Sequence, residues 1–212
     1  MDRVTISLLG VRFAYQPGLT VLDVPLLDVG PGLTLLLGAN GAGKTTLMRL
    51  MAGIEKPDEG TVTIDGRNLW TDEVGARKSM AYVPEQPDLT PYATISEVLS
   101  LVARLRGEPA SAAGSALAAA GLASLGHRTI RELSQGQRRR AVLGAAMIGS
   151  PDVVILDEPL ESLDVEMRGS MLGWVDSAVR RGATVLLSTH QAATFEGQAT
   201  RSIRMEAGRV VS

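Results

Sequence analysis

The clearest chemical pattern in this chain runs from Gly38 to Thr45, where the sequence reads GANGAGKT. The segment fits G-x-x-x-x-G-K-[ST] and lies between the short apolar run Leu33–Leu37 and a stretch whose apolar residues have helical spacing. The glycines let backbone N–H groups turn toward phosphate oxygens, and a helix that begins near Lys44 directs the positive end of its dipole at the same anion. We therefore predict a nucleoside triphosphate site, with Lys44 on the β- and γ-phosphates and the Thr45 hydroxyl on Mg²⁺. The residues assigned to nucleotide contact in this phosphate loop are Gly38, Ala39, Asn40, Gly41, Ala42, Gly43, Lys44, Thr45 and Thr46.

Two carboxylates follow a second apolar run, Val153–Leu156, at positions 157 and 158. In open α/β sheets, ligands bind at the carboxyl ends of the strands. Taken alone, an acidic helix cap explains the pair as well as a site does. With the phosphate loop upstream, the pattern favours Asp157 as a Mg²⁺ ligand through water and Glu158 as the general base for an attacking water.

Further motifs appear in a fixed order along the chain. They are Tyr15, Gln86 after Tyr82-Val83-Pro84-Glu85, the signature segment Leu133-Ser134-Gln135-Gly136-Gln137, Glu161-Ser162-Leu163-Asp164, and Ser188-Thr189-His190. Together with the phosphate loop and the acidic strand, they resemble the motifs of the ATP-binding cassette (ABC) ATPases over essentially the whole chain. In that family they are the adenine-stacking aromatic, the Q-loop, LSGGQ, the D-loop and the switch histidine.

The resemblance implies a role for each motif. Ser134, Gly136 and Gln137 form a second anion site that serves the ATP of a partner subunit, although Ser134 is also a suitable helix N-cap. Asp164 is expected at the nucleotide through the D-loop. The other side chains are expected at the ATP of their own chain.

The remaining roles concern catalysis and base stacking. His190 is expected to donate a hydrogen bond to the γ-phosphate or its water, and Gln86 to sense Mg²⁺ and water and to couple the site to a transmembrane partner. For Tyr15, stacking on adenine and packing beside Phe13 on one strand face are equally good interpretations. The predicted catalytic residues are thus Lys44, Gln86, Glu158 and His190, and the predicted metal ligands are Thr45, Gln86 and Asp157.

Two residues depart from the family pattern, and one charged triplet needs an interpretation. Gln135 replaces the first glycine of the signature, and Glu161 stands where a small residue begins the D-loop. The triplet Arg138–Arg140 is interpreted as a solvated face touching the signature segment, not as a nucleic-acid patch. Neither Gln135 nor Glu161 removes an acid, a base or a phosphate ligand, so hydrolysis remains the expectation.

Alternating strands and helices predict an α/β fold with a mainly parallel sheet. Strands are expected at Val4–Leu9, Val11–Tyr15, Val21–Val29, Leu33–Leu37, Thr61–Ile64, Met80–Val83, Val153–Leu156, Thr184–Ser188, Arg201–Met205 and Arg209–Val211. Helices are expected after the phosphate loop, from Ile95 to about Gly121, from Gly136 to Gly149, and over 165–181. The family resemblance makes this a P-loop NTPase core with an N-terminal antiparallel β subdomain and a helical subdomain at about 88–150, within a single ABC ATPase domain, 1–212.

The 212 residues include 23 acidic and 21 basic side chains, no Cys and two His, with a net charge of −2. This balance argues against a dedicated nucleic-acid binder, and the absent Cys excludes disulfides and thiolate metal sites. The longest apolar runs, Leu33–Ala39 and Ala141–Gly149, are too short to span a bilayer, and no secretory signal is apparent. The predicted location is therefore the cytoplasm, with membrane contact only through a permease.

These observations predict the ATP-hydrolysing subunit of a transporter, a homodimer or a heterodimer with a similar subunit, which binds ATP and Mg²⁺ and powers a separate transmembrane permease. One alternative is a non-transport ABC ATPase. However, the segment from Lys44 to Ser134 is too short for the coiled-coil arm of the chromosomal type, and the ribosomal type carries two cassettes. Another alternative is a regulatory module that binds ATP without hydrolysing it, which would fit Gln135 and Glu161 if they are disabling.

Overall fold

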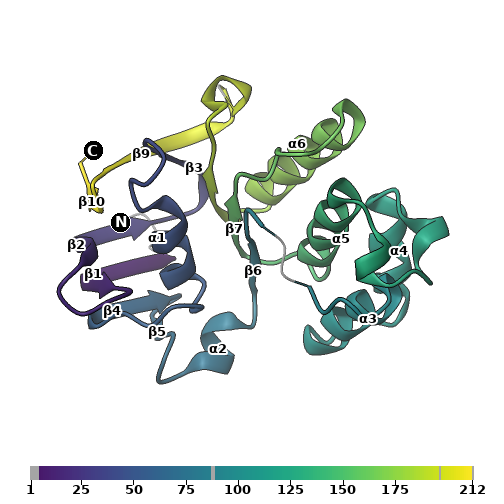
Figure 1. Ribbon diagram of the computed structural model, residues 1–212, viewed down its shortest axis with the longest axis horizontal. Coiled ribbons are helices and arrows are strands. Elements are labelled where there is room, and N and C mark those ends of the chain that lie inside the picture. The colour runs from purple at the N-terminus through teal and green to yellow at the C-terminus, as the bar shows by residue number, and fades with distance from the viewer. Residues whose placement is uncertain (1–4, 87–88, 196, 212) are drawn as a thin grey trace.

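The computed structural model describes residues 5–86, 89–195 and 197–211, whose strands form two sheets (Figure 1). The first sheet is antiparallel, in the order β2-β1-β4-β5, and consists of β1 (Ile6–Ala14), β2 (Thr20–Val29), β4 (Glu59–Ile64) and β5 (Arg67–Asn68). The second, in the order β10-β9-β3-β8-β7-β6, consists of β3 (Gly32–Leu37), β6 (Met80–Val83), β7 (Val153–Asp157), β8 (Thr184–Ser188), β9 (Ala199–Glu206) and β10 (Arg209–Val210). It is parallel from β9 to β6, and only β10 pairs antiparallel. The predicted fold class is confirmed.

The helices are α1 (Lys44–Met51), α2 (Glu73–Arg77), α3 (Ile95–Leu105), α4 (Ser111–Ala119), α5 (Gln135–Met147) and α6 (Val165–Arg180), with 3-10 turns at Ala123–Leu125, Ile130–Glu132 and Ala192–Phe195. Helix α6 packs on β3 and β8 of the central sheet, and three helices form a separate lobe (Figure 1). Helix α1 contacts β2 and β4 of one sheet and β7 of the other, so it fills the space between them. No helix in the described ranges is long and apolar enough to cross a membrane.

Helices α3, α4 and α5 form a lobe of their own, opposite the antiparallel sheet (Figure 1). Most of their buried side chains, among them Ile95, Leu99 and Leu117, make an apolar cluster of their own, whereas Val142 and Leu143 of α5 pack in the cluster on one face of the central sheet. The three helices fall within the range 88–150 expected for a helical subdomain. Strands β6 and β7 lie between this lobe and α1 (Figure 1).

The N-terminal strands differ from the expectation. Val4–Leu9 and Val11–Tyr15 were expected as two strands, but Ile6–Ala14 forms one, and Val4 lies outside the described residues. Gly10 has a φ of +62°, and the pairing with β4 shifts register between Leu9 and Arg12. A glycine that adopts a positive φ lets one strand pass through an irregularity without ending, so the sequence break is a bulge.

The central strands bring the predicted site residues to one edge of the sheet. All side chains of β7 and β8 are buried, as in parallel strands covered on both faces. In this register Asp157 lies opposite Ser188, and Ser188 lies opposite Leu36, just before the phosphate loop. The loops that follow β3, β7 and β8 therefore meet at their carboxyl ends.

Candidate nucleotide site

The phosphate loop leads from β3 into α1, and its lysine is held inside it. Lys44 is 7% exposed and donates hydrogen bonds from Nζ to the carbonyl oxygens of Gly38 (2.7 Å) and Ala39 (3.2 Å). Helix α1 begins after Gly43 with no side-chain cap. Its N-terminal dipole therefore faces the cavity with no protein side chain capping it, which is the arrangement that suits an anion.

The glycines of the loop are required by packing as well as by backbone conformation. Gly38, Gly41 and Gly43 have φ values of +153°, +79° and +99°. A Cβ on Gly38 would lie 2.5 Å from the Met205 carbonyl oxygen, and one on Gly43 would lie 2.9 Å from Leu22. The loop thus sits directly against β9 and β2, and its shape depends on having no side chain at these places.

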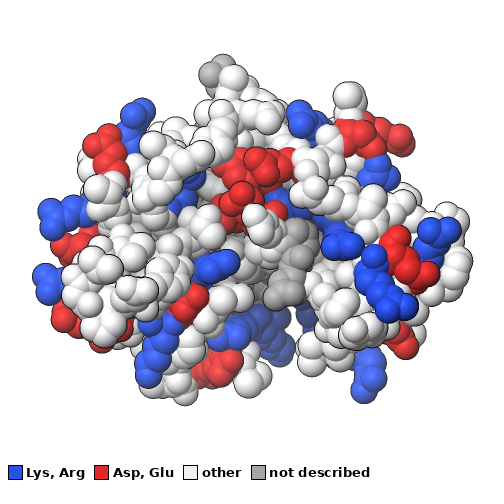
Figure 2. Space-filling model, viewed as in Figure 1, with Lys and Arg blue, Asp and Glu red and all other residues white. Residues whose placement is uncertain are grey.

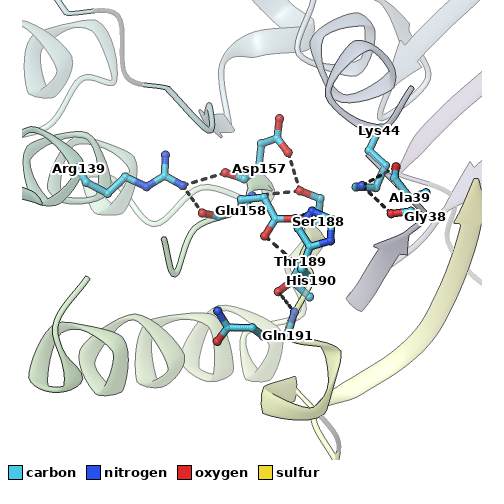
Figure 3. Close-up of polar contacts among 10 residues, drawn as sticks. All are labelled: Gly38, Ala39, Lys44, Arg139, Asp157, Glu158, Ser188, Thr189, His190 and Gln191. Atoms are coloured by element: carbon cyan, nitrogen blue, oxygen red, sulfur yellow. Dashed lines mark hydrogen bonds and ion pairs between the residues drawn. The ribbon is translucent and has the colours of Figure 1, made fainter. Parts of the chain in front are cut away.

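The acidic pair after β7 is oriented by the end of β8 (Figure 3). Ser188 Oγ donates to Asp157 Oδ1 (2.5 Å) and accepts from the N–H of Glu158 (3.0 Å). Glu158 has a φ of +46°, in the left-handed region that costs a residue with a Cβ roughly 1–2 kcal/mol. Ser188 therefore fixes both carboxylate residues, a role that the sequence analysis did not assign to it.

Glu158 and His190 face each other across the loops that follow β7 and β8 (Figure 3). His190 Nε2 lies 3.3 Å from Glu158 Oε1, and the His190 N–H donates to Oε2 at 3.3 Å. Burial raises the pKa of Glu158; His190 and Lys44 oppose that rise, and the nearby Glu161 carboxylate adds to it. A partly buried carboxylate with a raised pKa, beside a half-exposed His, is suited to accept a proton.

The residues present fit a magnesium ion bound with a nucleotide. Asp157 is 1% exposed, and its Oδ2 has no hydrogen-bond partner among the described residues. A buried carboxylate oxygen without a partner is costly unless a ligand or water completes it. Thr45, whose hydroxyl is the other predicted ligand, lines the same cavity. The described residues include no group of three or more His, Asp or Glu that could hold a metal by itself.

One cavity of about 480 Å³ joins these groups. It is lined by Val21, Ala39–Thr46, Glu85, Asp157, Glu158, Glu161 and His190. The structure thus brings most of the predicted phosphate-loop residues together with the acidic pair and His190. Figure 2 shows acidic side chains gathered in the middle of the viewed face, near β7.

Gln86 is not among the residues that line this cavity. Its side chain lines a neighbouring groove of about 570 Å³ between the central sheet and the helical lobe, together with Tyr82 and Val142, whereas Glu85 lines the phosphate cavity. The two residues are adjacent in the chain but face different spaces. The role of Gln86 at the metal therefore stays a prediction, and among the described residues of this loop Glu85 lines the cavity.

Tyr15 lies beside the phosphate loop but not in the cavity lining. It is 51% exposed, its ring packs edge-on against Phe13 at a centroid distance of 4.8 Å, and its hydroxyl lies 3.3 Å from Thr46 Oγ1. The packing contact with Phe13 is thus present. The exposed ring leaves the stacking role a prediction.

The signature segment lies at the start of α5, away from the cavity of its own chain. Ser134 Oγ accepts the N–H of Gln137 (3.2 Å) and Gln137 Oε1 accepts the N–H of Ser134 (3.0 Å), a reciprocal capping box. A Cβ on Gly136 would lie 3.2 Å from the Ser162 carbonyl oxygen. The cap is therefore observed for Ser134, and its contact with a nucleotide stays a prediction.

Asp164 also has contacts within the protein. It caps α6 by accepting the N–H of Met167 (2.9 Å) and forms an ion pair with Arg140. The pair joins α5 to the start of α6. None of the signature residues, nor Asp164, reaches the phosphate cavity of this chain.

The interpretation of Arg138–Arg140 as a solvated face is wrong for its middle residue. Arg139 is 2% exposed and donates from Nη1 to the carbonyl oxygens of Pro84 and Glu85, and from Nη2 to those of Asp157 and Glu158. Arg138 does touch the signature segment, through the Leu133 carbonyl oxygen at 3.2 Å. Helical spacing places three successive residues on different faces of α5, so one of them must point at the sheet.

Comparison with known proteins identifies relatives over most of the chain. Residues 27–161 match the family described as "ABC transporter". The chain is 36% identical over 197 residues to a Nod factor export ATP-binding protein I of Burkholderia pseudomallei, covering 91% of this chain and 65% of that protein. It is 36% identical over 184 residues to the cytochrome c biogenesis ATP-binding export protein CcmA of Cupriavidus necator, covering 85% and 79%. The chain thus spans slightly less than two thirds of the Nod factor export protein.

Solved structures share the whole architecture. An ATP-binding subunit of an ABC transporter superposes with a TM-score of 0.89 at 28% identity, covering 98% of this chain and 88% of that one. A dimeric ATP-binding cassette in a post-hydrolysis state, bound to ADP and inorganic phosphate, superposes with a TM-score of 0.86 at 25% identity, covering 98% and 97%. The arrangement of the two sheets and the helical lobe therefore matches that of solved ATP-binding subunits.

Proposed function

Because this chain belongs to the ABC transporter family, we propose that it is an ATP-hydrolysing nucleotide-binding subunit that powers a transmembrane permease. The observation that carries the proposal is the single cavity in which Lys44 and the α1 N-terminus face Asp157, Glu158 and His190. The unit is one ABC ATPase domain over 1–212, with a helical subdomain at about 88–150.

The cavity can hold the triphosphate of ATP along the phosphate loop. Lys44 Nζ and the start of α1 offer positive charge to the β- and γ-phosphates, and Thr45 and Asp157 would hold Mg²⁺. When bound, the ion would neutralise charge that develops on the phosphate oxygens. The unpartnered Asp157 Oδ2 supports this placement.

Glu158 is placed to accept the proton of an attacking water. The water oxygen would form a bond to the γ-phosphorus as the bond between that phosphorus and the β–γ bridging oxygen breaks, so ADP and inorganic phosphate are the products. His190 lies close to both carboxylate oxygens of Glu158 and opposes the rise in the pKa of Glu158, and it is placed to offer a hydrogen bond to the γ-phosphate. The Ser188 hydroxyl bonds both Asp157 and Glu158 and so fixes their positions relative to each other.

We propose that two such subunits enclose ATP between them. Ser134, Gly136, Gln137 and Asp164 do not line the phosphate cavity of their own chain. Since α5 presents its exposed N-terminus as an anion site, that site would serve the ATP of a partner. The solved dimeric cassette with ADP and phosphate supports this arrangement, in a homodimer or in a heterodimer with a similar subunit.

The partners follow from the same placement. A permease would be contacted at the groove beside Gln86, which joins the helical lobe to the central sheet, and the chain would lie at the cytoplasmic face of the membrane through that contact alone. We propose no nucleic-acid partner. The net charge is −2, and basic side chains are scattered over the viewed face without a continuous strip (Figure 2).

The proposal is tested by ATP turnover of the purified chain with and without magnesium. We expect ATP hydrolysis with Mg²⁺ and a rate at least about tenfold lower with excess EDTA, because the phosphate charge is then not neutralised. A phosphate-release assay measures the rate, and sedimentation measures ATP-dependent association. Binding of ATP with no hydrolysis would contradict the proposal and favour the regulatory module instead.

The acid limb of the pH profile should report Glu158. Its pKa is raised in the nucleotide-free protein, and a general base must be deprotonated, so kcat/KM should fall as the pH is lowered through that raised value. Glu161→Gln removes a like charge that contributes to the rise, so the limb should move to lower pH. The measurement is kcat/KM against pH, with Glu166→Gln, an exposed position on α6, as the control that leaves the limb in place. A limb that moved to higher pH in Glu161→Gln would contradict the assignment.

A further inference from the structure

Arg139 is the most deeply buried Lys or Arg among the described residues, at 2% exposed. Its guanidinium is buried, and in the described part of the chain no carboxylate forms an ion pair with it. Burial lowers its pKa. A buried cation is costly unless it is paired and hydrogen-bonded. Here Nη1 and Nη2 bond four backbone carbonyl oxygens, whereas the buried Nε has no hydrogen-bond partner among the described residues.

The four carbonyls belong to two segments that define the site. Two are on Pro84 and Glu85, directly after β6, and two are on Asp157 and Glu158, at the end of β7. Nη2 donates to the Asp157 oxygen at 2.8 Å, and Nη1 to that of Glu85 at 2.8 Å. One planar fork therefore fixes the loop that faces the cavity and the acidic pair relative to each other.

The backbone at Glu158 depends on that fork. Its φ of +46° is a conformation that residues with a Cβ keep only when the surroundings hold it. Three contacts hold the backbone of this residue: Ser188 Oγ accepts its N–H, and its carbonyl oxygen accepts from Arg139 Nη2 and from the N–H of Glu161 (3.2 Å). The direction of the Glu158 side chain follows from the backbone angles, so Arg139 contributes to where the carboxylate points.

Arg139 also belongs to the signature helix. It lies one turn after Ser134, which caps the N-terminus of α5. A displacement of α5 therefore moves the guanidinium, and with it the two segments bonded to it. Resting on the proposed function, we propose that Arg139 is a positioning residue that couples the signature helix to the general base of its own chain.

The test compares Arg139→Lys with a matched arginine in the same lobe. Arg106, at the end of α3, is half-buried and also donates to backbone carbonyls, those of Ala145, Ala146, Ile148 and Met80, but none of them borders the phosphate cavity. We expect Arg139→Lys to lower kcat at least about tenfold and to leave the KM for ATP within about threefold, because lysine cannot bond all four oxygens. Arg106→Lys should leave kcat within about twofold of the parent, even if its Tm falls as much as that of Arg139→Lys.

A double-mutant cycle separates positioning from a general loss of structure. If Arg139 acts through Glu158, adding Arg139→Lys to Glu158→Gln should lower the residual rate by less than about twofold. An additive tenfold loss in that background would overturn the proposal. So would a decrease in kcat matched by Arg106→Lys at equal Tm.

Hydrogen exchange gives a readout that needs no activity. In Arg139→Lys, the peptides that contain Glu85 and Glu158 should exchange faster than in the parent, whereas in Arg106→Lys they should not. Arg139→Gln, which keeps two N–H donors, replaces the lysine variant if that one does not fold. Unchanged exchange in both peptides would overturn the proposal. A parent chain without magnesium-dependent hydrolysis would overturn the proposed function, while the exchange result would still decide whether Arg139 holds the two segments.

Discussion

Glu158→Gln is expected to lower kcat for ATP hydrolysis by about three orders of magnitude, the middle to upper part of the range for loss of a general base. The amide has nearly the same shape as the carboxylate but cannot accept the proton of the attacking water. Asp157, Ser188 and Lys44 remain in place, so Mg²⁺-dependent ATP binding should stay within about threefold of the parent. Single-turnover hydrolysis and equilibrium nucleotide binding measure the two effects separately.

The control for this variant is the second carboxylate of the same cavity wall. Glu161 also lines the cavity, but it makes no contact with His190 among those found in the described residues. Glu161→Gln should therefore keep kcat within a few-fold of the parent at neutral pH. Similar losses in Glu158→Gln and Glu161→Gln would mean that the wall acts through its total charge and that Glu158 has no special role.

Association should persist when hydrolysis is lost. If ATP is enclosed between two subunits, hydrolysis is the step that reopens them, so Glu158→Gln should accumulate as a dimer with ATP and Mg²⁺. Sedimentation of the variant with ATP and with ADP measures this difference. A variant that binds ATP but stays monomeric at high concentration would contradict the enclosed arrangement.

The parts of the site that local sequence could predict are those formed by a single continuous segment. The phosphate loop carries its glycines, lysine and threonine within eight positions, and the composition of the apolar run before Asp157 is enough to indicate a strand. The strands Met80–Val83 and Thr184–Ser188 coincide with the observed β6 and β8 for the same reason. Short apolar runs of these residues suit a strand covered on both faces wherever the fold places it.

The parts that were missed depend on contacts between distant segments. The charge triplet Arg138–Arg140 indicates a polar helix face, and nothing local shows that the carbonyl ends of β6 and β7 lie opposite its middle residue. Ser188 was noted only as part of a motif, although the register of β7 on β8 places its hydroxyl between Asp157 and Glu158. Likewise, nothing local to the pair indicates that Glu85 lines the phosphate cavity and Gln86 the neighbouring groove.

Short elements at turns were also difficult to predict. Helix α2 has only five residues and contains Gly75, so it has too few apolar positions for a helical pattern. Its one local signal is Asp72, whose side chain accepts the N–H of Gly75 as an N-cap. At Gly10 the opposite error arose, because a glycine typical of a turn serves as an irregularity inside β1.

Lys44→Met is expected to weaken the binding of Mg²⁺ and ADP by about 10- to 100-fold, the loss typical of one or two hydrogen bonds to a charged group. The lysine is already directed at the loop, since Nζ bonds the carbonyl oxygens of Gly38 and Ala39. Methionine keeps a long, unbranched side chain at this buried position without the charge. Gly38 is partly exposed and Ala39 is exposed, so water can replace the donor that their carbonyl oxygens lose. We therefore expect the fold to survive, with a Tm within a few degrees of the parent.

Titration calorimetry with ADP and Mg²⁺ measures the change in affinity. Lys78→Met is the matched control, because it removes the same charge from an exposed position at the end of α2, away from the cavity lining. Unchanged affinity in Lys44→Met, or an equal loss in Lys78→Met, would contradict the placement of the phosphates on the loop. A loss confined to Lys44→Met would instead assign the anion to the part of the cavity next to the Lys44 amine and the N-terminus of α1, and Glu158, the proposed general base, lines that same cavity.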